Sequence, residues 1–254
     1  MNDLTLQLLT GSIIGLGAGY VGSFMVLRRM SLVGDALSHV ALPGIAVSIL
    51  LNINPFFGAF AALLLAIILI WLLEKRTELP SETLVGIMFT LSLALGLLLT
   101  PGPELLEALF GDITQIQSLD LIITVISTIV IFIVMKKISE KLMLGIVSKE
   151  MAQANKIPIH KINFIFLFMV AVIVALGLKV VGTLLMGALV IIPAAAAKNI
   201  SVNLAQYTKR SMLFGVLSAS LGLLAATYIG ITPGPTIVLT AGIIFVITLF
   251  FKQK

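Results

Sequence analysis

The sequence alternates between long apolar stretches and short polar breaks. Nine mostly apolar stretches carry little or no charge, and they cover residues 6–27, 36–52, 55–73, 82–99, 119–135, 162–178, 180–197, 211–229 and 236–251. An α-helix rises about 1.5 Å per residue, so stretches of this length match the hydrocarbon core of a bilayer, about 30 Å thick. The pattern predicts an all-α, polytopic transmembrane helical bundle of nine spans, with eight as the alternative, in a multi-pass protein of the cell (inner) membrane.

The composition agrees with a membrane protein that forms one domain. Of the 254 residues, 59% are hydrophobic and 11% are charged, whereas about a quarter of the residues in a soluble domain are charged. No Ser-rich linker, charge run or low-complexity tract divides the chain, so a single membrane domain over residues 1–254 is expected. Asp3 precedes the first stretch without any Lys or Arg, which is the wrong charge for a cleaved signal peptide.

Lys and Arg residues indicate the orientation, because positive residues are retained in cytoplasmic loops. With the N-terminus outside and the C-terminus cytoplasmic, all of the sixteen Lys and Arg residues except Lys179 fall in inner segments, at 28–35, 74–80, 136–161, 198–210 and 252–254. The largest outer loop, 100–119, carries Glu104, Glu107 and Asp112 and no basic residue. The basic residues form short clusters without interleaved aromatics, so they read as topology signals and nucleic acid is not an expected partner.

Asp35 and His39 are the strongest candidates for chemistry. They are spaced i and i+4 and therefore lie on one helix face about one turn apart. Counting from Arg28 and Arg29 at the inner interface, His39 falls near the middle of the bilayer, where an ionisable residue usually faces a pathway or a partner. Carboxylate oxygen and imidazole nitrogen together suit divalent manganese, iron or zinc. The alternative is a helix-capping Asp followed by an interior His with satisfied hydrogen bonds.

Proline and glycine residues predict breaks or close approaches within the spans. Pro43 and Gly44 follow His39, and a Pro-Gly pair inside a span kinks the helix and frees backbone carbonyls. Pro193 offers a second break, either as a gate or as an ordinary kink. Glycines at 11, 15 and 19 in the first stretch predict close helix packing, either within the chain or at a dimer seam.

The inner segment 136–161 is the longest and contains a predicted short helix at 145–155. Ser148 can cap this helix, Lys149 and Glu150 lie in its first turn, and Met151 offers an adaptable apolar contact. His160 reads as a surface histidine without a role. The chain has no phosphate-binding Gly-x-x-x-x-Gly-Lys-Ser/Thr loop and no recognisable catalytic set, so it is not expected to be an enzyme or to bind ATP by that device. The absence of cysteine excludes thiolate ligands and disulfides.

Four blocks of the sequence resemble the manganese and zinc permease family of ATP-binding-cassette (ABC) importers. They lie at 21–32, 34–46, 181–197 and 234–239, and Gly-Asp-Ala-Leu-Ser-His at 34–39 is the most specific. The resemblance implies that Asp35 and His39 take part in passage of a divalent metal (manganese, zinc or iron), with no permanently bound cofactor. It also implies a homodimer in membrane lipid, a cytoplasmic ABC ATPase dimer docked on about 147–155, and an extracellular or periplasmic metal-binding protein.

Two features leave alternatives open. The chain has Val147-Ser148-Lys149-Glu150 where the family often has an aromatic followed by an acidic pair, so its polar contacts to the ATPase are expected to differ. The competing hypotheses are a permease for a chelated metal such as an iron siderophore or cobalamin, an ion-coupled secondary carrier, and a membrane sensor or scaffold. Asp35 and His39 argue against the chelate. A carrier usually needs several membrane-embedded charges for coupling, and Asp35 is the only carboxylate expected inside the bilayer, which argues against the carrier.

Overall fold

In the computed structural model, residues 3–77, 79–99, 111, 116–183 and 185–251 are described, and this part of the chain contains helices and no strand. The helices are α1 (Asp3–Leu27), α2 (Leu32–Val40), α3 (Leu42–Leu50), α4 (Pro55–Arg76), α5 (Ser81–Leu99), α7 (Ser118–Val147), α8 (Lys149–Ala154), α9 (Ile159–Val181), α10 (Met186–Ile200), α11 (Leu204–Ile229) and α12 (Pro233–Leu249). The prediction of an all-helical fold is therefore confirmed.

Helices occupy each of the nine predicted apolar stretches. Within the described residues, seven helical segments are long and apolar enough to cross a membrane, with α2 and α3 forming one segment, and α10 and α12 are shorter apolar helices. The number of spans and the orientation stay predictions. Most of the predicted outer loop 100–119, including Glu104, Glu107 and Asp112, lies outside the described residues.

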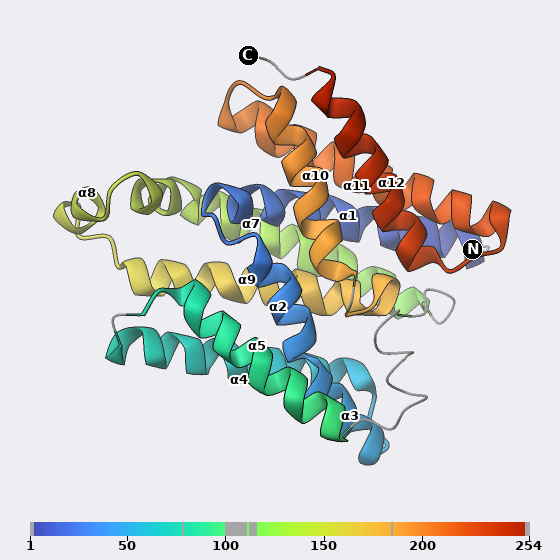
Figure 1. The fold of residues 1–254 in the computed structure, drawn as a ribbon, viewed down its shortest axis with the longest axis horizontal. Helices are drawn as coiled ribbons and strands as arrows, with labels where there is room; N and C mark the ends of the chain where they lie inside the picture. Colours follow the sequence, from blue (N-terminus) through green and yellow to red (C-terminus); the bar gives the residue numbers. More distant parts are fainter. Residues whose placement is uncertain (1–2, 78, 100–110, 112–115, 184, 252–254) are drawn as a thin grey trace.

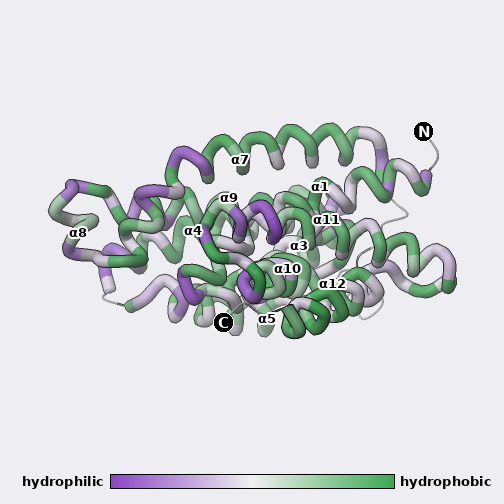
Figure 2. The backbone as a smooth tube through the Cα atoms, turned by 90° about the horizontal axis from the view of Figure 1, so that it is seen from above, coloured by the Kyte–Doolittle hydropathy of each residue, from purple (hydrophilic) through white to green (hydrophobic). Residues whose placement is uncertain are grey.

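The helices are arranged around a central set that follows the long axis of the molecule. α1, α7 and α9 run along this axis, with α10, α11 and α12 on one side and α3, α4 and α5 on the other (Figure 1). α2 lies between these two groups and contacts α5, α9 and α10. α8 and the N-terminus lie at opposite ends of the long axis (Figure 1). The long helices are mostly hydrophobic, and hydrophilic residues gather around α8 and the adjoining end of α7 (Figure 2).

Glycines allow α1 to pack closely within the bundle. A Cβ at Gly15 would lie 2.3 Å from the carbonyl oxygen of Gly215 on α11, and one at Gly19 would lie 2.3 Å from that of Ser211. Backbone-to-backbone contact of this kind needs residues without a side chain. Gly11 has open space instead. The prediction of close packing is confirmed, and Gly15 and Gly19 serve it within the chain.

The segment Leu32–Leu50 is bent between two short helices. α2 ends at Val40, Ala41 is a single turn residue, and α3 begins at Leu42 with Pro43 in its first turn. Pro43 has no N–H and therefore cannot donate to the carbonyl of His39 four residues earlier. The predicted interruption is present at Ala41, two residues before the Pro-Gly pair.

Gly44 lies at a close crossing between α3 and α4. A Cβ at Gly44 would lie 2.0 Å from the carbonyl oxygen of Gly58, and a Cβ at Gly58 would lie 2.1 Å from that of Gly44. The helices thus touch through their backbones at this pair. The structure gives Gly44 a packing role, and gating by Pro43 and Gly44 stays a prediction.

Pro193 does not interrupt its helix, and an ordinary proline kink, the other predicted alternative, is compatible with a continuous helix. α10 continues as a helix from Met186 to Ile200 with Pro193 inside it. A proline removes one helical hydrogen bond, but contacts with neighbouring helices can hold the helix together, and α10 packs against α1, α11 and α12. A gating role for Pro193 is a separate prediction that the continuous helix does not decide.

Candidate functional site

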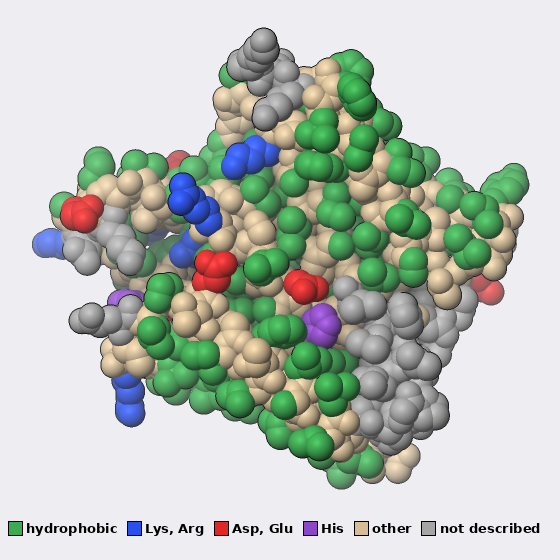
Figure 3. Space-filling model, in the orientation of Figure 1, with side chains coloured by type: hydrophobic (Ala, Val, Ile, Leu, Met, Phe, Trp, Pro, Cys, Tyr) green, Lys and Arg blue, Asp and Glu red, His purple; other side chains and the backbone are tan. Residues whose placement is uncertain are grey.

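Asp35 and His39 lie on α2, in the middle of the bundle's cross-section between α5 and α10. The side chain of His39 is 8% exposed, and its ring stands edge-on against Phe89 of α5 with 5.4 Å between centroids. Asp35 is half-buried. On one face of the molecule, a histidine lies beside an acidic side chain among hydrophobic residues (Figure 3). The structure therefore brings the two predicted residues together on one helix.

A hydrogen bond of His39 determines which of its ring nitrogens carries the proton and which carries the lone pair. Nδ1 lies 3.0 Å from the backbone carbonyl oxygen of Asp35. A carbonyl can only accept, so Nδ1 must carry the proton in this arrangement, and the lone pair of the neutral imidazole lies on Nε2. Nε2 is consequently the atom available to a metal ion.

The carboxylate of Asp35 has no hydrogen-bond or ion-pair partner among the described residues, which is unusual for an acidic group in a helical bundle. α10 approaches the backbone of Asp35 closely, because a Cβ at Gly187 would lie only 2.5 Å from the Cβ of Asp35. Any larger residue at 187 would displace α2. Gly187 was not singled out from the sequence, and only its position in the block 181–197 pointed to it.

Two donor residues are few for holding a metal ion. The described part of the chain contains no group of three or more His, Cys, Asp or Glu side chains close enough to share an ion. Structural zinc sites use four ligands and divalent manganese or iron generally use more. Asp35 and His39 of a single chain are therefore too few ligands for such a site by themselves.

The predicted short helix on the longest inner segment is present as α8. The hydroxyl of Ser148 accepts a hydrogen bond from the backbone N–H of Met151 at 3.1 Å, as the predicted cap requires, and it donates to a carboxylate oxygen of Glu150 at 2.8 Å. Met151 is 54% exposed. The side chain of Lys149 lies outside the described part of the structure. Ser148, Glu150 and Met151 thus share one small exposed turn.

A polar cluster that the sequence did not reveal joins four helices at the end of the bundle nearest α8. Arg28 donates to the Oδ1 of Asn163 at 2.6 Å, and the amide of Asn163 donates to Glu74 at 2.8 Å. Ser81 also donates to Glu74, at 3.0 Å. The pKa of the Arg28 guanidinium is lowered, because burial outweighs the opposite effect of the nearby Glu74 carboxylate. His160, given no role from the sequence, lies 3.7 Å from the same Glu74 oxygen and is 56% exposed.

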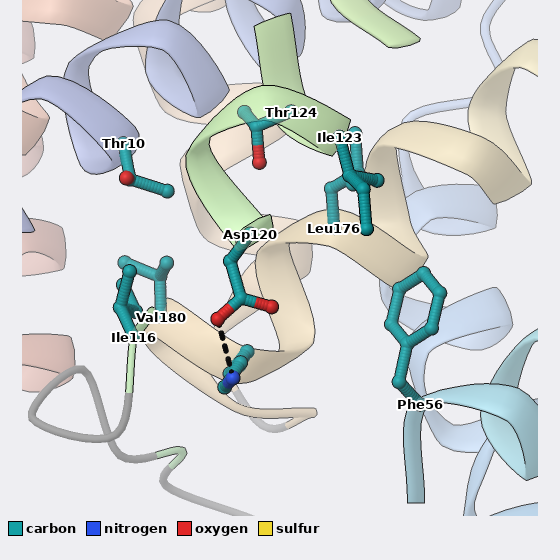
Figure 4. A pocket seen from close by; sticks show the side chains of 9 residues that line it. Thr10, Phe56, Ile116, Asp120, Ile123, Thr124, Leu176 and Val180 are labelled. Atoms are coloured by element: carbon teal, nitrogen blue, oxygen red, sulfur yellow. Dashed lines mark hydrogen bonds and ion pairs between the residues drawn. The ribbon is translucent and has the colours of Figure 1, made fainter. Parts of the chain in front are cut away.

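Lys179, the exception in the charge distribution, forms an ion pair. Its Nζ lies 2.6 Å from the Oδ2 of Asp120 at the start of α7. The pair borders a small cavity that is also lined by Thr10, Phe56 and Thr124, as Figure 4 shows. The cavity holds about 20 Å³, close to the space of one water molecule. No second group of metal ligands surrounds it among the described residues.

These features define a class of protein. An all-helical integral membrane protein whose bundle holds a carboxylate and an imidazole nitrogen side by side, with no partner among the described residues, fits the class of membrane transport proteins. The chain belongs to the ABC 3 transport family, which matches it over residues 2–252.

Known relatives cover nearly the whole chain. It is 34% identical over 251 residues to the manganese import system permease protein ScaB of Streptococcus gordonii, covering 97% of this chain and 90% of that protein. It is also 34% identical over 253 residues to the high-affinity zinc uptake system membrane protein ZnuB of Haemophilus influenzae, covering 97% of each. The structure of PsaBC from Streptococcus pneumoniae in complex with Fab aligns with a TM-score of 0.86 and 32% identity, covering 100% of this chain and 93% of that one.

Proposed function

We propose that this chain is the membrane permease subunit of an ATP-driven importer for a divalent transition metal, namely manganese, zinc or iron. One observation carries the proposal: a carboxylate and an imidazole Nε2, each without a hydrogen-bond partner among the described residues, lie one turn apart on α2, in a segment apolar enough to cross the membrane. These are donor types that divalent manganese, iron and zinc accept. The metal is cargo, and no permanent cofactor is proposed.

A homodimer would complete the ligand set. A two-fold axis brings any group near the axis to its own copy. Two Asp35 and two His39 side chains at the axis would offer four ligands of mixed oxygen and nitrogen. Because import requires release, we expect this set to form in one state of the transporter and to separate in another.

The remaining partners follow from the family and from α8. The chain lacks a phosphate-binding loop, so a cytoplasmic ABC ATPase dimer would supply the energy and dock on α8 through Ser148, Lys149, Glu150 and Met151. An extracellular or periplasmic metal-binding protein would deliver the ion at the opposite side. The position of α8 and the N-terminus at opposite ends of the long axis (Figure 1) supports an outside N-terminus with a cytoplasmic α8.

Metal uptake by cells tests the proposal. The cells carry this importer, its ATPase and its binding protein as their only route for manganese or zinc. Asp35→Asn keeps the side-chain shape and removes the charge, and His39→Ala removes the imidazole. Each variant is expected to lower uptake at least about 100-fold, since each removes two of the four ligands in the dimer.

The matched control is His160→Ala, which removes the chain's other histidine from the polar cluster near α8. It is expected to keep uptake within about two-fold of the wild type. All variants are checked for dimer assembly and ATPase binding. Near-normal uptake by both Asp35→Asn and His39→Ala would refute the metal site and favour a structural reading of the two residues.

A further inference from the structure

Ser38 lies beside the proposed ligands Asp35 and His39, and it is not itself proposed as a metal ligand. Its side chain is fully buried, and its Oγ lies 2.7 Å from the carbonyl oxygen of Asp35 and 2.6 Å from that of Thr183. Thr183 lies in the turn that joins α9 to α10. The hydroxyl of Ser38 is therefore the polar link between the helix that bears Asp35 and His39 and this turn.

Two carbonyl oxygens compete for the single proton of Ser38. A hydroxyl donates one hydrogen bond, and a carbonyl oxygen accepts about two. Within α2 the Asp35 carbonyl faces the backbone N–H of His39, and it also lies 3.0 Å from the Nδ1 of that residue. These two donors occupy both lone pairs of the Asp35 carbonyl oxygen. The hydroxyl of Ser38 therefore donates its hydrogen bond to the carbonyl oxygen of Thr183.

Burial of Thr183 makes loss of the hydrogen bond to its carbonyl oxygen costly. Thr183 is fully buried, and its side-chain hydroxyl has no hydrogen-bond partner in the described part of the protein. An unpaired buried carbonyl costs about 1–3 kcal/mol. Loss of the Ser38 hydroxyl would remove the hydrogen bond that the described residues give this carbonyl, and the turn and α2 would be free to separate.

We propose that Ser38 is a positioning residue for metal transport: it anchors α2 to the α9–α10 turn and thereby holds His39 with Nδ1 protonated and Nε2 directed to the ion. The ring has polar partners on one side and an aromatic partner on the other. Nδ1 lies 3.0 Å from the Asp35 carbonyl oxygen and 3.4 Å from the Oγ of Ser38. That Oγ can only accept from Nδ1–H once its own proton is donated to Thr183, and the ring of Phe89 packs against the imidazole at 84°. Hydrogen-bond partners of a metal-binding histidine fix its tautomer and orientation in this way. The inference rests on the proposed function.

The first test reads the tautomer directly in the wild-type importer. When only this chain is labelled with ¹⁵N-histidine and is assembled with unlabelled partner subunits, the signals come from two residues, His39 and His160, and a His160→Gln variant assigns them. Chemical shifts of the two ring nitrogens distinguish Nδ1–H from Nε2–H. The assembled importer in lipid nanodiscs is expected to hold His39 as Nδ1–H, and a predominantly Nε2–H His39 would overturn the proposal without any variant at position 38.

The second test measures transport with Mn²⁺ and Zn²⁺ as probes. Ser38→Ala is expected to raise the half-saturating metal concentration for uptake about 10-fold to 100-fold, the usual loss when a partner of a metal ligand is removed, and to give a mixture of His39 tautomers. Ser38→Thr keeps the hydroxyl and is expected to recover the Nδ1–H tautomer and most of the affinity.

The matched control is Ser211→Ala. Ser211 is equally buried and also donates to a backbone carbonyl of another helix, that of Gly19, away from α2. It should cost similar stability and leave the half-saturating concentration and the tautomer unchanged. If Ser38→Ala behaves like Ser211→Ala while Asp35→Asn and His39→Ala abolish uptake, the role of Ser38 is refuted and the proposed function stands. If the latter two variants keep normal uptake, it is the proposed metal site that fails.

Discussion

The ammonium group of Lys179, at the end of α9, lies 2.6 Å from the carboxylate of Asp120, at the start of α7. Lys179 is the one basic residue outside the predicted inner segments, and the ion pair offsets its charge. The side chains are 35% and 30% exposed, so water screens the pair only in part. The contact joins the ends of α7 and α9 that lie away from α8.

A double-mutant cycle should detect this ion pair. Lys179→Met and Asp120→Asn are each expected to lower the thermal stability of the purified protein, and the double variant should lose less than the sum. The expected coupling is about 1 kcal/mol, near the upper end for partly exposed pairs. Thermal unfolding in detergent at low and at high salt measures it. Strict additivity of the two losses would contradict a stabilising pair.

Substitutions on α8 should uncouple ATP hydrolysis from transport. Met151→Asp places a charge on the exposed apolar side chain of the turn, and Glu150→Lys reverses its acidic one, so both should disturb the proposed docking surface. Metal-stimulated ATP hydrolysis by the assembled importer is expected to fall about 10-fold or more, as for a central interface residue worth over 1.4 kcal/mol. The permease itself should unfold at the wild-type temperature.

Val202→Asp is the matched control for α8, because Val202 is 74% exposed on another predicted inner connection, between α10 and α11. It should leave ATP hydrolysis unchanged. Equal losses from Val202→Asp and Met151→Asp would mean that α8 is not the particular docking site.

Gly44 should not tolerate even one added methyl group. A Cβ at this position meets the backbone of Gly58, which cannot move aside as a flexible side chain would. Gly44→Ala is expected to destabilise the protein by about 1–3 kcal/mol through overpacking. Gly86→Ala on α5 is the matched control, because a Cβ there meets nothing within 4 Å and alanine favours a helix by about 1 kcal/mol. If Gly86→Ala lowered the unfolding temperature as much as Gly44→Ala, the close contact between Gly44 and Gly58 would not explain the loss of stability.

The orientation can be tested with single cysteines, since the natural sequence has none. Ile231→Cys lies between α11 and α12 and should react with an impermeant maleimide in intact cells. Asn155→Cys, just after α8, should react only once the inner face is opened. These expectations follow from the retention of Lys and Arg on the cytoplasmic side. Labelling of Asn155→Cys in intact cells would reverse the proposed topology.

The sequence predicted the parts of the fold that depend on local chemistry. Apolar length located each helix, the cap of Ser148 on α8 followed from its hydroxyl, and the bend before Pro43 followed from the missing N–H. The spacing of Asp35 and His39 put them on one helix face. Each of these features involves residues within a few positions of one another.

Contacts between distant residues could not be read in the same way. Arg28, Asn163 and Glu74 are far apart in the sequence, and each looked like an ordinary polar residue at a helix end; only the packing of α1, α4 and α9 brings them together. The link from Ser38 to Thr183 and the partner of Lys179 were hidden for the same reason. Pro193 shows the opposite case, because tertiary packing keeps α10 helical against the local preference of proline.

The bend at Ala41 also has an electrostatic consequence. α2 has nine residues, so it is about 14 Å long and reaches roughly half-way across the hydrocarbon core. A helix carries about half a negative elementary charge at its C-terminal end. In a straight span that end would lie at the membrane surface in water, but here it lies within the bundle, next to His39, whose carbonyl accepts from the backbone N–H of Ala41. α3 begins at Leu42, one residue further on, so its partly positive N-terminal end adjoins the partly negative end of α2. The bend thus brings two opposite helix ends together beside His39, where a straight span would keep them at the two membrane surfaces.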